Sequence, residues 1–89
     1  MKRITIDCAA ISDRGAFHDS FSSALSFPNW YGRNLDALHD CLAAISEDTH
    51  LALHNWSALE AALGNYAALA RTVLTHAEDE NLHLNVEFC

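Results

Sequence analysis

Asp36, His39 and Asp40 are the residues whose types and spacing best suit chemistry in this chain of 89 residues. A helix turns by about 100° per residue, which places these three side chains on one face together with Ala43. The apolar residues of the same segment fall on the opposite face: Leu35, Leu38, Leu42 and Ile45. Two carboxylates beside an imidazole are suited to general acid–base catalysis or to contact with a cationic partner.

Acid–base catalysis is disfavoured at this face, because an exposed helix surface has no pocket that would shift pKa values or exclude water. Asp36 and Asp40 also repel each other by about 0.2–0.5 kcal/mol at this spacing, so helix stability does not favour the pair. The helix dipole offsets part of the repulsion at Asp36. The spacing alone therefore leaves two interpretations, a solvated polar face and a docking surface for a cationic partner.

An aromatic loop precedes this acidic face. Trp30 and Tyr31 stand directly before Gly32, and exposed aromatic side chains beside charges are typical of binding hot spots. We expect one of the two aromatic residues to belong to the core. An aromatic loop followed by an acidic helix face indicates a surface that docks a basic partner.

Histidine and cysteine are spaced poorly for a metal site. His50 and His54 would point the same way on a strand, but zinc needs three or four convergent ligands and no third one has a characteristic spacing. We expect neither a metal nor a cofactor. The three cysteines form no CxxC pair and are odd in number, which argues against a disulfide framework and for a reducing cytoplasm.

The charge of the chain is negative and unevenly distributed. Five Lys and Arg residues against twelve Asp and Glu residues give a net charge of −7, which disfavours direct binding of nucleic acid. The residues after 33 hold only Arg71 against nine carboxylates. This acidity serves solubility or a cationic partner. No export signal and no apolar run long enough for a membrane are expected, so the protein is predicted to be cytoplasmic.

The pattern of apolar residues predicts a single small α/β domain over residues 1–89. Strands and helices follow in the order strand, two helices, strand, two helices, strand, over residues 3–8, 13–26, 34–45, 51–56, 57–63, 66–78 and 82–88. Strands separated by helices favour a parallel sheet with right-handed crossovers. We therefore expect a three-stranded parallel sheet covered by about four helices.

Local signals set the ends and faces of these helices. Pro28 restricts the residue before it to extended backbone, so the first helix should end before Phe27. The other ends are predicted from residue type: Ser12 or Asp13 and Asn34 as N-caps, Ser57 with Glu60 as a capping box, Gly64 as a stop and Asn65 as a new N-cap. The expected core-facing residues are Phe17, Phe21 and Leu25 in the first helix and Tyr66, Leu69, Val73 and Ala77 in the last.

One segment carries a family resemblance. Residues 27–42 read FPNWYGRNLDALHDCL, and this run resembles the signature of the barstar family, intracellular protein inhibitors of small secreted ribonucleases. Proline, two aromatics, glycine, Asn-Leu-Asp-Ala-Leu and Asp-Cys-Leu occur in the family's order and spacing. The length of the chain and the order of its elements agree with the family over nearly all 89 residues. The family fold is a three-stranded parallel sheet covered by helices.

The resemblance implies an inhibitor without catalytic activity, which blocks the active site of a basic extracellular-type ribonuclease or ribonuclease toxin. Asp40 matches the carboxylate that occupies the place of a substrate phosphate, since a carboxylate accepts paired Arg bonds but offers no scissile bond. The free protein is expected to be a monomer. The predicted partner-binding residues are Trp30, Tyr31, Gly32, Asn34, Leu35, Asp36, His39, Asp40, Ala43 and His76.

Four positions depart from the best-known member of the family. His39 and Ile45 stand where that protein has tryptophan, Ala43 where it has a hydroxyl residue, and His76 where it has an acidic contact. These departures imply a ribonuclease partner whose surface around the active site differs from that of the best-known member's target. The acidic run 78–80 either restores charge near His76 or is a solvated helix end, where acids oppose the helix dipole. The rival functions are an acidic module for a basic protein other than a ribonuclease, and a small enzyme.

Overall fold

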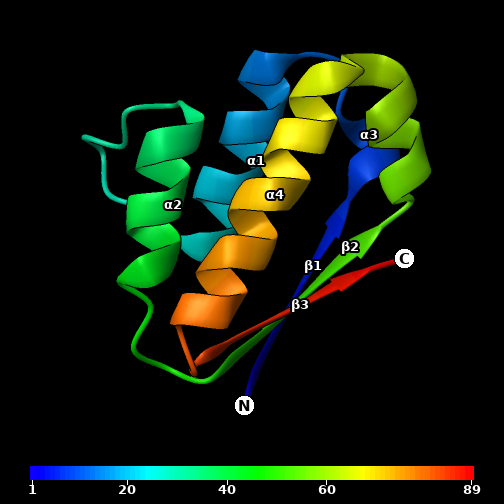
Figure 1. The fold of residues 1–89 in the computed structure, drawn as a ribbon. Helices are drawn as coiled ribbons and strands as arrows, with labels where there is room; N and C mark the ends of the chain where they lie inside the picture. Colours follow the sequence, from blue (N-terminus) through cyan, green and yellow to red (C-terminus); the bar gives the residue numbers. More distant parts are fainter.

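The computed structural model describes all residues from Met1 to Cys89. Figure 1 shows an α/β fold in which three strands form one sheet and the long helices α1, α2 and α4 lie together on one side of it. The elements are β1 (Lys2–Asp7), the short 3-10 helix η1 (Cys8–Ala10), α1 (Arg14–Leu25), α2 (Leu35–Ala43), β2 (Thr49–His54), α3 (Trp56–Leu63), α4 (Asn65–Glu80) and β3 (Leu84–Phe88).

The sheet is parallel throughout, as predicted, with β2 between β1 and β3. In the register of the strands, Ile4, Leu51 and Val86 lie side by side. Period-two alternation therefore gives these strands one apolar face toward the helices. The other face carries mostly polar residues, including His50, whose Nε2 lies 3.0 Å from Oε1 of Glu87 on the neighbouring strand.

A single core lies between the sheet and the helices. Helix α1 packs against β1 and α4 packs against β3, while α2 packs against α4 and α3 packs against α4 and η1. The largest fully buried side chains come from every layer: Phe17, Phe21, Leu38, Leu42, Leu51, Leu53, Leu59, Leu74 and Cys8. Helix α2 packs against α4 and buries Leu38 and Leu42, and its opposite face is left in solvent.

Several predicted boundaries are confirmed. Asp13 caps α1 through a 2.7 Å hydrogen bond from the backbone N–H of Ala16 to its side chain, and α1 ends at Leu25, before Phe27. Asn34 caps α2 in the same way, accepting from the N–H of Ala37 at 2.7 Å. Gly64 ends α3 with a positive φ of 57°, a conformation that glycine adopts without strain.

Other boundaries are wrong. Trp56 begins α3 instead of ending β2, and Asn55 precedes the helix with no side-chain cap, so the Ser57–Glu60 capping box does not form. Asn65 is the first residue of α4 and not its N-cap, since the N-cap position is taken by Gly64. Leu82 is 98% exposed and lies outside β3. The reason is tertiary, since pairing with β2 starts only at Leu84.

The predicted buried face of α4 is confirmed at Ala77, and Tyr66 and Val73 pack against the core as expected, but Leu69 does not. Leu69 is 50% exposed, while the buried residues are Ala67, Ala70, Leu74 and Ala77. Alanine side chains let the backbone of α4 approach its neighbours closely, and this close approach decides which face turns inward. Helix α2 ends at Ala43, two residues before the predicted end at Ile45.

Candidate partner-binding site

The polar face of α2 has the predicted composition. Asp36 lies in the first turn, and Asp36, Asp40 and Ala43 are exposed while Leu38 and Leu42 are fully buried. The two carboxylates thus point to solvent from one side of a helix whose other side is fixed in the core. Leu35 is half-buried and packs against the core.

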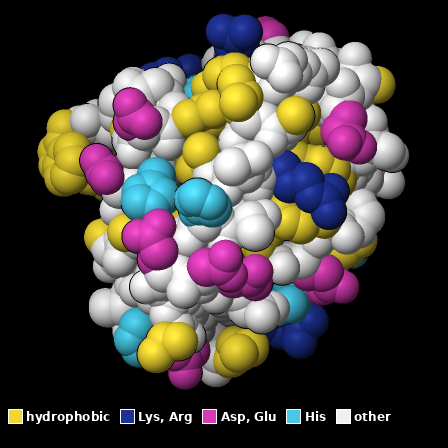
Figure 2. Space-filling view, in the orientation of Figure 1, with side chains coloured by type: hydrophobic (Ala, Val, Ile, Leu, Met, Phe, Trp, Pro, Cys, Tyr) yellow, Lys and Arg dark blue, Asp and Glu magenta, His cyan; other side chains and the backbone are white.

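His39 joins this face to α4. Its side chain is 34% exposed, and its Nε2 lies 3.2 Å from Oε1 of Glu80, while its Nδ1 lies 3.9 Å from Oδ1 of Asp40. His76 is exposed one helical turn before Glu80. Figure 2 shows acidic and histidine side chains gathered over α2 and α4, with lysine and arginine side chains lying away from them. The acidic face therefore spans two helices.

The acidic run at the end of α4 divides between two roles. Glu80 turns toward α2, as described, whereas Oε2 of Glu78 accepts a 2.6 Å hydrogen bond from the backbone N–H of Val86 in β3. Asp79 is exposed. Glu80 adds a negative charge beside His39, and sequence reasoning missed its individual role because nothing local separates it from Glu78.

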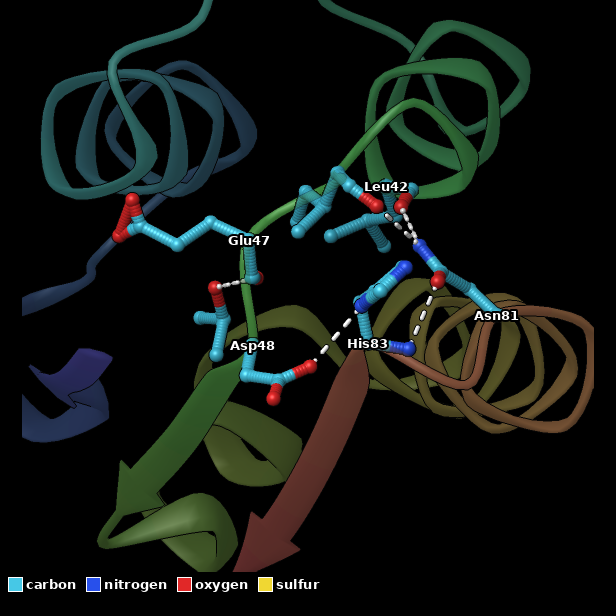
Figure 3. A network of polar contacts seen from close by, with 7 residues as sticks. Leu42, Glu47, Asp48, Asn81 and His83 are labelled. Carbon is cyan, nitrogen blue, oxygen red and sulfur yellow. Dashed lines mark hydrogen bonds and ion pairs between the residues drawn. The ribbon is translucent and has the colours of Figure 1, made fainter. Parts of the chain in front are cut away.

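Asn81 fixes the position of α2 relative to α4. Its buried Nδ2 donates to the carbonyl oxygens of Leu42 and Ile45, each at 2.9 Å, and so satisfies the free carbonyls at the end of α2. Figure 3 shows this contact beside the pair formed by His83 and Asp48, whose Nδ1 and Oδ1 atoms are 2.9 Å apart. The parts of the acidic face on α2 and on α4 are thus held together by the hydrogen bonds of Asn81.

The aromatic loop is a tight turn. The backbone N–H of Tyr31 donates to the carbonyl of Pro28 at 3.0 Å, which closes the turn and leaves Trp30 at its tip with 81% of its surface exposed. Tyr31 is only 7% exposed and packs against Phe27, with ring centroids 4.9 Å apart. The expectation that Tyr31 contacts a partner is therefore corrected, because its ring fills the core beneath the loop.

A buried histidine anchors the loop. Nδ1 of His18 lies 2.7 Å from the hydroxyl of Tyr31, and its Nε2 lies 2.7 Å from the hydroxyl of Tyr66. Burial lowers the pKa of His18, with a smaller contribution from Arg33, and burial raises the pKa of Tyr31. A neutral imidazole donates through one nitrogen and accepts through the other, and a tyrosine hydroxyl can do either, so the neutral form that burial favours can bond to both tyrosines.

Arg33 ties the other end of the loop to α1. It forms an ion pair with Asp19 and donates to the carbonyl of Gly15 at 3.2 Å, and its backbone has a φ of +55°. Nδ2 of Asn34 donates to the carbonyl of Gly32 at 3.3 Å. Sequence reasoning missed Asp19, His18 and Arg33 as positioning residues, because their partners are far away in the chain and no local pattern connects them.

These contacts define the acidic docking surface, a name used below for one set of residues: Trp30, Gly32, Asn34, Asp36, His39, Asp40, Ala43, His76 and Glu80. All except His39 are exposed, and His39 is half-buried. Seven of the predicted residues lie on α2 and in the loop that precedes it, His76 comes from α4, and Glu80 is added. The surface is backed by buried contacts, and it presents carboxylates and one exposed tryptophan.

No group of three or more His, Cys, Asp or Glu side chains converges as metal ligands would, including His50 and His54 on β2. Burial raises the pKa of Cys41, and the negative charge of Asp40 adds to this, so the thiol is a poor nucleophile. No helix has the length and apolar character needed to cross a bilayer.

Comparison with known proteins agrees with this geometry. The family model described as "Barstar (barnase inhibitor)" matches residues 1–89. The Bacillus subtilis protein named "Putative ribonuclease inhibitor YrdF" is 37% identical over 81 residues, which cover 90% of this chain and 89% of that protein. Both descriptions are of inhibitors and not of enzymes. By a match over its whole length, the chain belongs to the barstar family.

Proposed function

We propose that this protein is a cytoplasmic immunity protein that blocks the active site of a small basic ribonuclease with its acidic docking surface. The observation that carries the proposal is that Asp36, Asp40 and Glu80 are exposed beside Trp30 on a surface backed by buried contacts. A rigid surface loses little conformational freedom on binding, which favours tight association. The family supports a ribonuclease as the target class.

The mechanism is steric occlusion assisted by electrostatics. A ribonuclease active site gathers cationic groups around a substrate phosphate, and the carboxylate of Asp40 takes the place of that phosphate. Asp36, one turn before Asp40 on α2, and Glu80, which contacts His39, meet the rim of the cleft. The net charge of −7 attracts a basic partner from a distance and raises the rate of encounter. The chain acts as a monomer before it binds.

Inhibition of purified enzymes tests this proposal. The chain is titrated against a panel of small basic ribonucleases that includes barnase, with cleavage of a fluorogenic RNA as the readout. We expect complete inhibition of at least one enzyme at a 1:1 ratio. Asp40→Ala should release that enzyme about 30-fold faster or more, because truncating one partner of a buried charge pair costs roughly 2 kcal/mol or more.

Glu60→Ala is the matched control. Glu60 is an exposed carboxylate on α3, so this variant removes the same charge from a different part of the molecule. It should inhibit as the wild type does. The proposal is wrong if no enzyme of the panel is inhibited, or if Asp40→Ala inhibits as well as Glu60→Ala.

The second candidate is an acidic module that binds a basic protein other than a ribonuclease. It is favoured by the same exposed carboxylates and by the departures at His39 and His76, which alter the rim of the surface. Under this alternative a ribonuclease of the panel would be bound without loss of RNA cleavage, or would not be bound. Binding measured by calorimetry beside the cleavage assay separates the two functions.

A further inference from the structure

An apolar groove runs beside the acidic docking surface. It has a volume of about 440 Å³ and lies between the end of α1, the aromatic loop, α2 and the start of β1. Its apolar lining includes Ile4, Leu25, Phe27 and Ile45. All four side chains also pack against the core cluster, so the floor of the groove is fixed by the fold.

The groove is continuous with the acidic docking surface. Trp30 and Asp40 belong to both, since each lies on the surface and also lines the groove. A protein that contacts both Trp30 and Asp40 therefore also borders the groove. The indole of Trp30 is 81% exposed, so it can pack against an apolar group that enters the groove.

Charge at the rim restricts the occupant. Two carboxylates, Asp40 and Glu47, line the groove together with one lysine, Lys2. Figure 3 shows the Glu47 side chain extending from the segment between α2 and β2, away from Asp48 and His83. An apolar floor with an excess of carboxylates at the rim is complementary to an apolar group that adjoins a cation.

We propose that the groove receives an aliphatic or aromatic side chain of the ribonuclease, presented next to a lysine or arginine that pairs with Asp40 or Glu47. This inference rests on the proposed function. The volume is in the range that holds small ligands, so one large apolar side chain and the aliphatic stem of the neighbouring cation fit together. The groove thus distinguishes basic ribonucleases that present such an apolar side chain from those that do not, which net charge alone cannot do.

Filling the groove tests the proposal. Ala44 lines it, is exposed and has helical backbone, so a tryptophan there is compatible with the fold. Ala44→Trp should weaken binding to the inhibited ribonuclease by about tenfold or more, mainly through faster dissociation. Ser46→Trp fills the groove from a second exposed position and should act alike. The matched control is Ala62→Trp, an exposed alanine of α3, which should bind as the wild type does.

The failure of this inference differs from failure of the proposed function. If both groove variants bind as tightly as Ala62→Trp while Asp40→Ala loses binding, the groove inference is overturned and the inhibitor function stands. If Asp40→Ala also binds normally, the proposed function falls. Sedimentation of the free protein tests a second copy as the occupant: a wild-type dimer that Ala44→Trp disperses would overturn the inference. Thermal unfolding of each variant checks that its fold is intact.

Discussion

Nε2 of His39 on α2 lies 3.2 Å from Oε1 of Glu80 on α4. The two residues are 41 positions apart in the chain but belong to one surface. The acidic face of α2 therefore extends onto the end of α4. His76 stands one turn before Glu80. A negative charge is therefore present at position 80, whereas position 76 has histidine where the best-known family member has an acidic residue. The relationship makes Glu80 a candidate contact for a basic partner.

The first prediction compares two neighbouring carboxylates. Glu80→Ala should reduce affinity for the ribonuclease several-fold and leave stability unchanged, because its side chain is 60% exposed and lies on the docking surface. Glu78→Ala should lower the free energy of unfolding by about 1–2 kcal/mol, since the N–H of Val86 loses its acceptor. Calorimetric binding and urea unfolding measure the two effects. The assignment fails if the two variants show the same profile.

The second prediction concerns salt. The association rate with the ribonuclease should fall steeply as salt rises, while the dissociation rate changes little, because steering acts between separated charges and is screened over about 10 Å at 0.1 M. Stopped-flow mixing at several salt concentrations measures the rates. An association rate that is insensitive to salt would contradict steering by the excess of carboxylates after residue 33.

The third prediction concerns charge at the two histidines of the surface. His39 faces Asp40 and Glu80, and His76 lies one helical turn before Glu80. The double variant His39→Lys, His76→Lys should weaken binding to the ribonuclease, because it adds positive charge within an otherwise negative surface. The double variant His39→Gln, His76→Gln is the uncharged control, and calorimetry measures both. Equal affinity of the two double variants would contradict a place for these positions opposite cationic groups of the partner.

The fourth prediction is pH-dependent stability through His18. Burial lowers its pKa in the folded state, so the unfolded state binds the proton more readily. Its contribution is therefore complete above about pH 6.5 and is lost as the pH falls toward the lowered pKa. Urea unfolding should show a steeper loss of stability below about pH 6.5 in the wild type than in His18→Gln. Parallel pH curves would contradict the role of the buried imidazole.

The fifth prediction separates the two aromatic residues of the loop. Trp30→Ala should leave stability unchanged and weaken binding, because the indole is almost fully exposed. Tyr31→Phe removes the hydroxyl bonded to His18 and should lower stability by about 1 kcal/mol, with a smaller effect on binding. Thermal unfolding and calorimetry check both variants. A reversed outcome would place Tyr31 on the docking surface after all.

Local patterns in the sequence were sufficient for the elements that carry the site. The parallel sheet, the cap at Asn34 and the division of α2 into an apolar and an acidic face follow from periodicity, capping and chain order. These features depend on residues within a few positions of one another. The same locality explains the errors at Ser57 and Asn65, where residue type favoured a cap and tertiary packing placed the helix start elsewhere.

The sequence by itself determined the fold class, the family signature and the carboxylates Asp36 and Asp40 on one exposed face. Only the tertiary structure decided that Tyr31 is buried and Trp30 exposed, and that Glu80 and not Glu78 lies beside His39. The physical reason is that these outcomes depend on contacts between residues distant in the chain. A side chain's neighbours in space are set by how helices pack on the sheet, which no local pattern encodes.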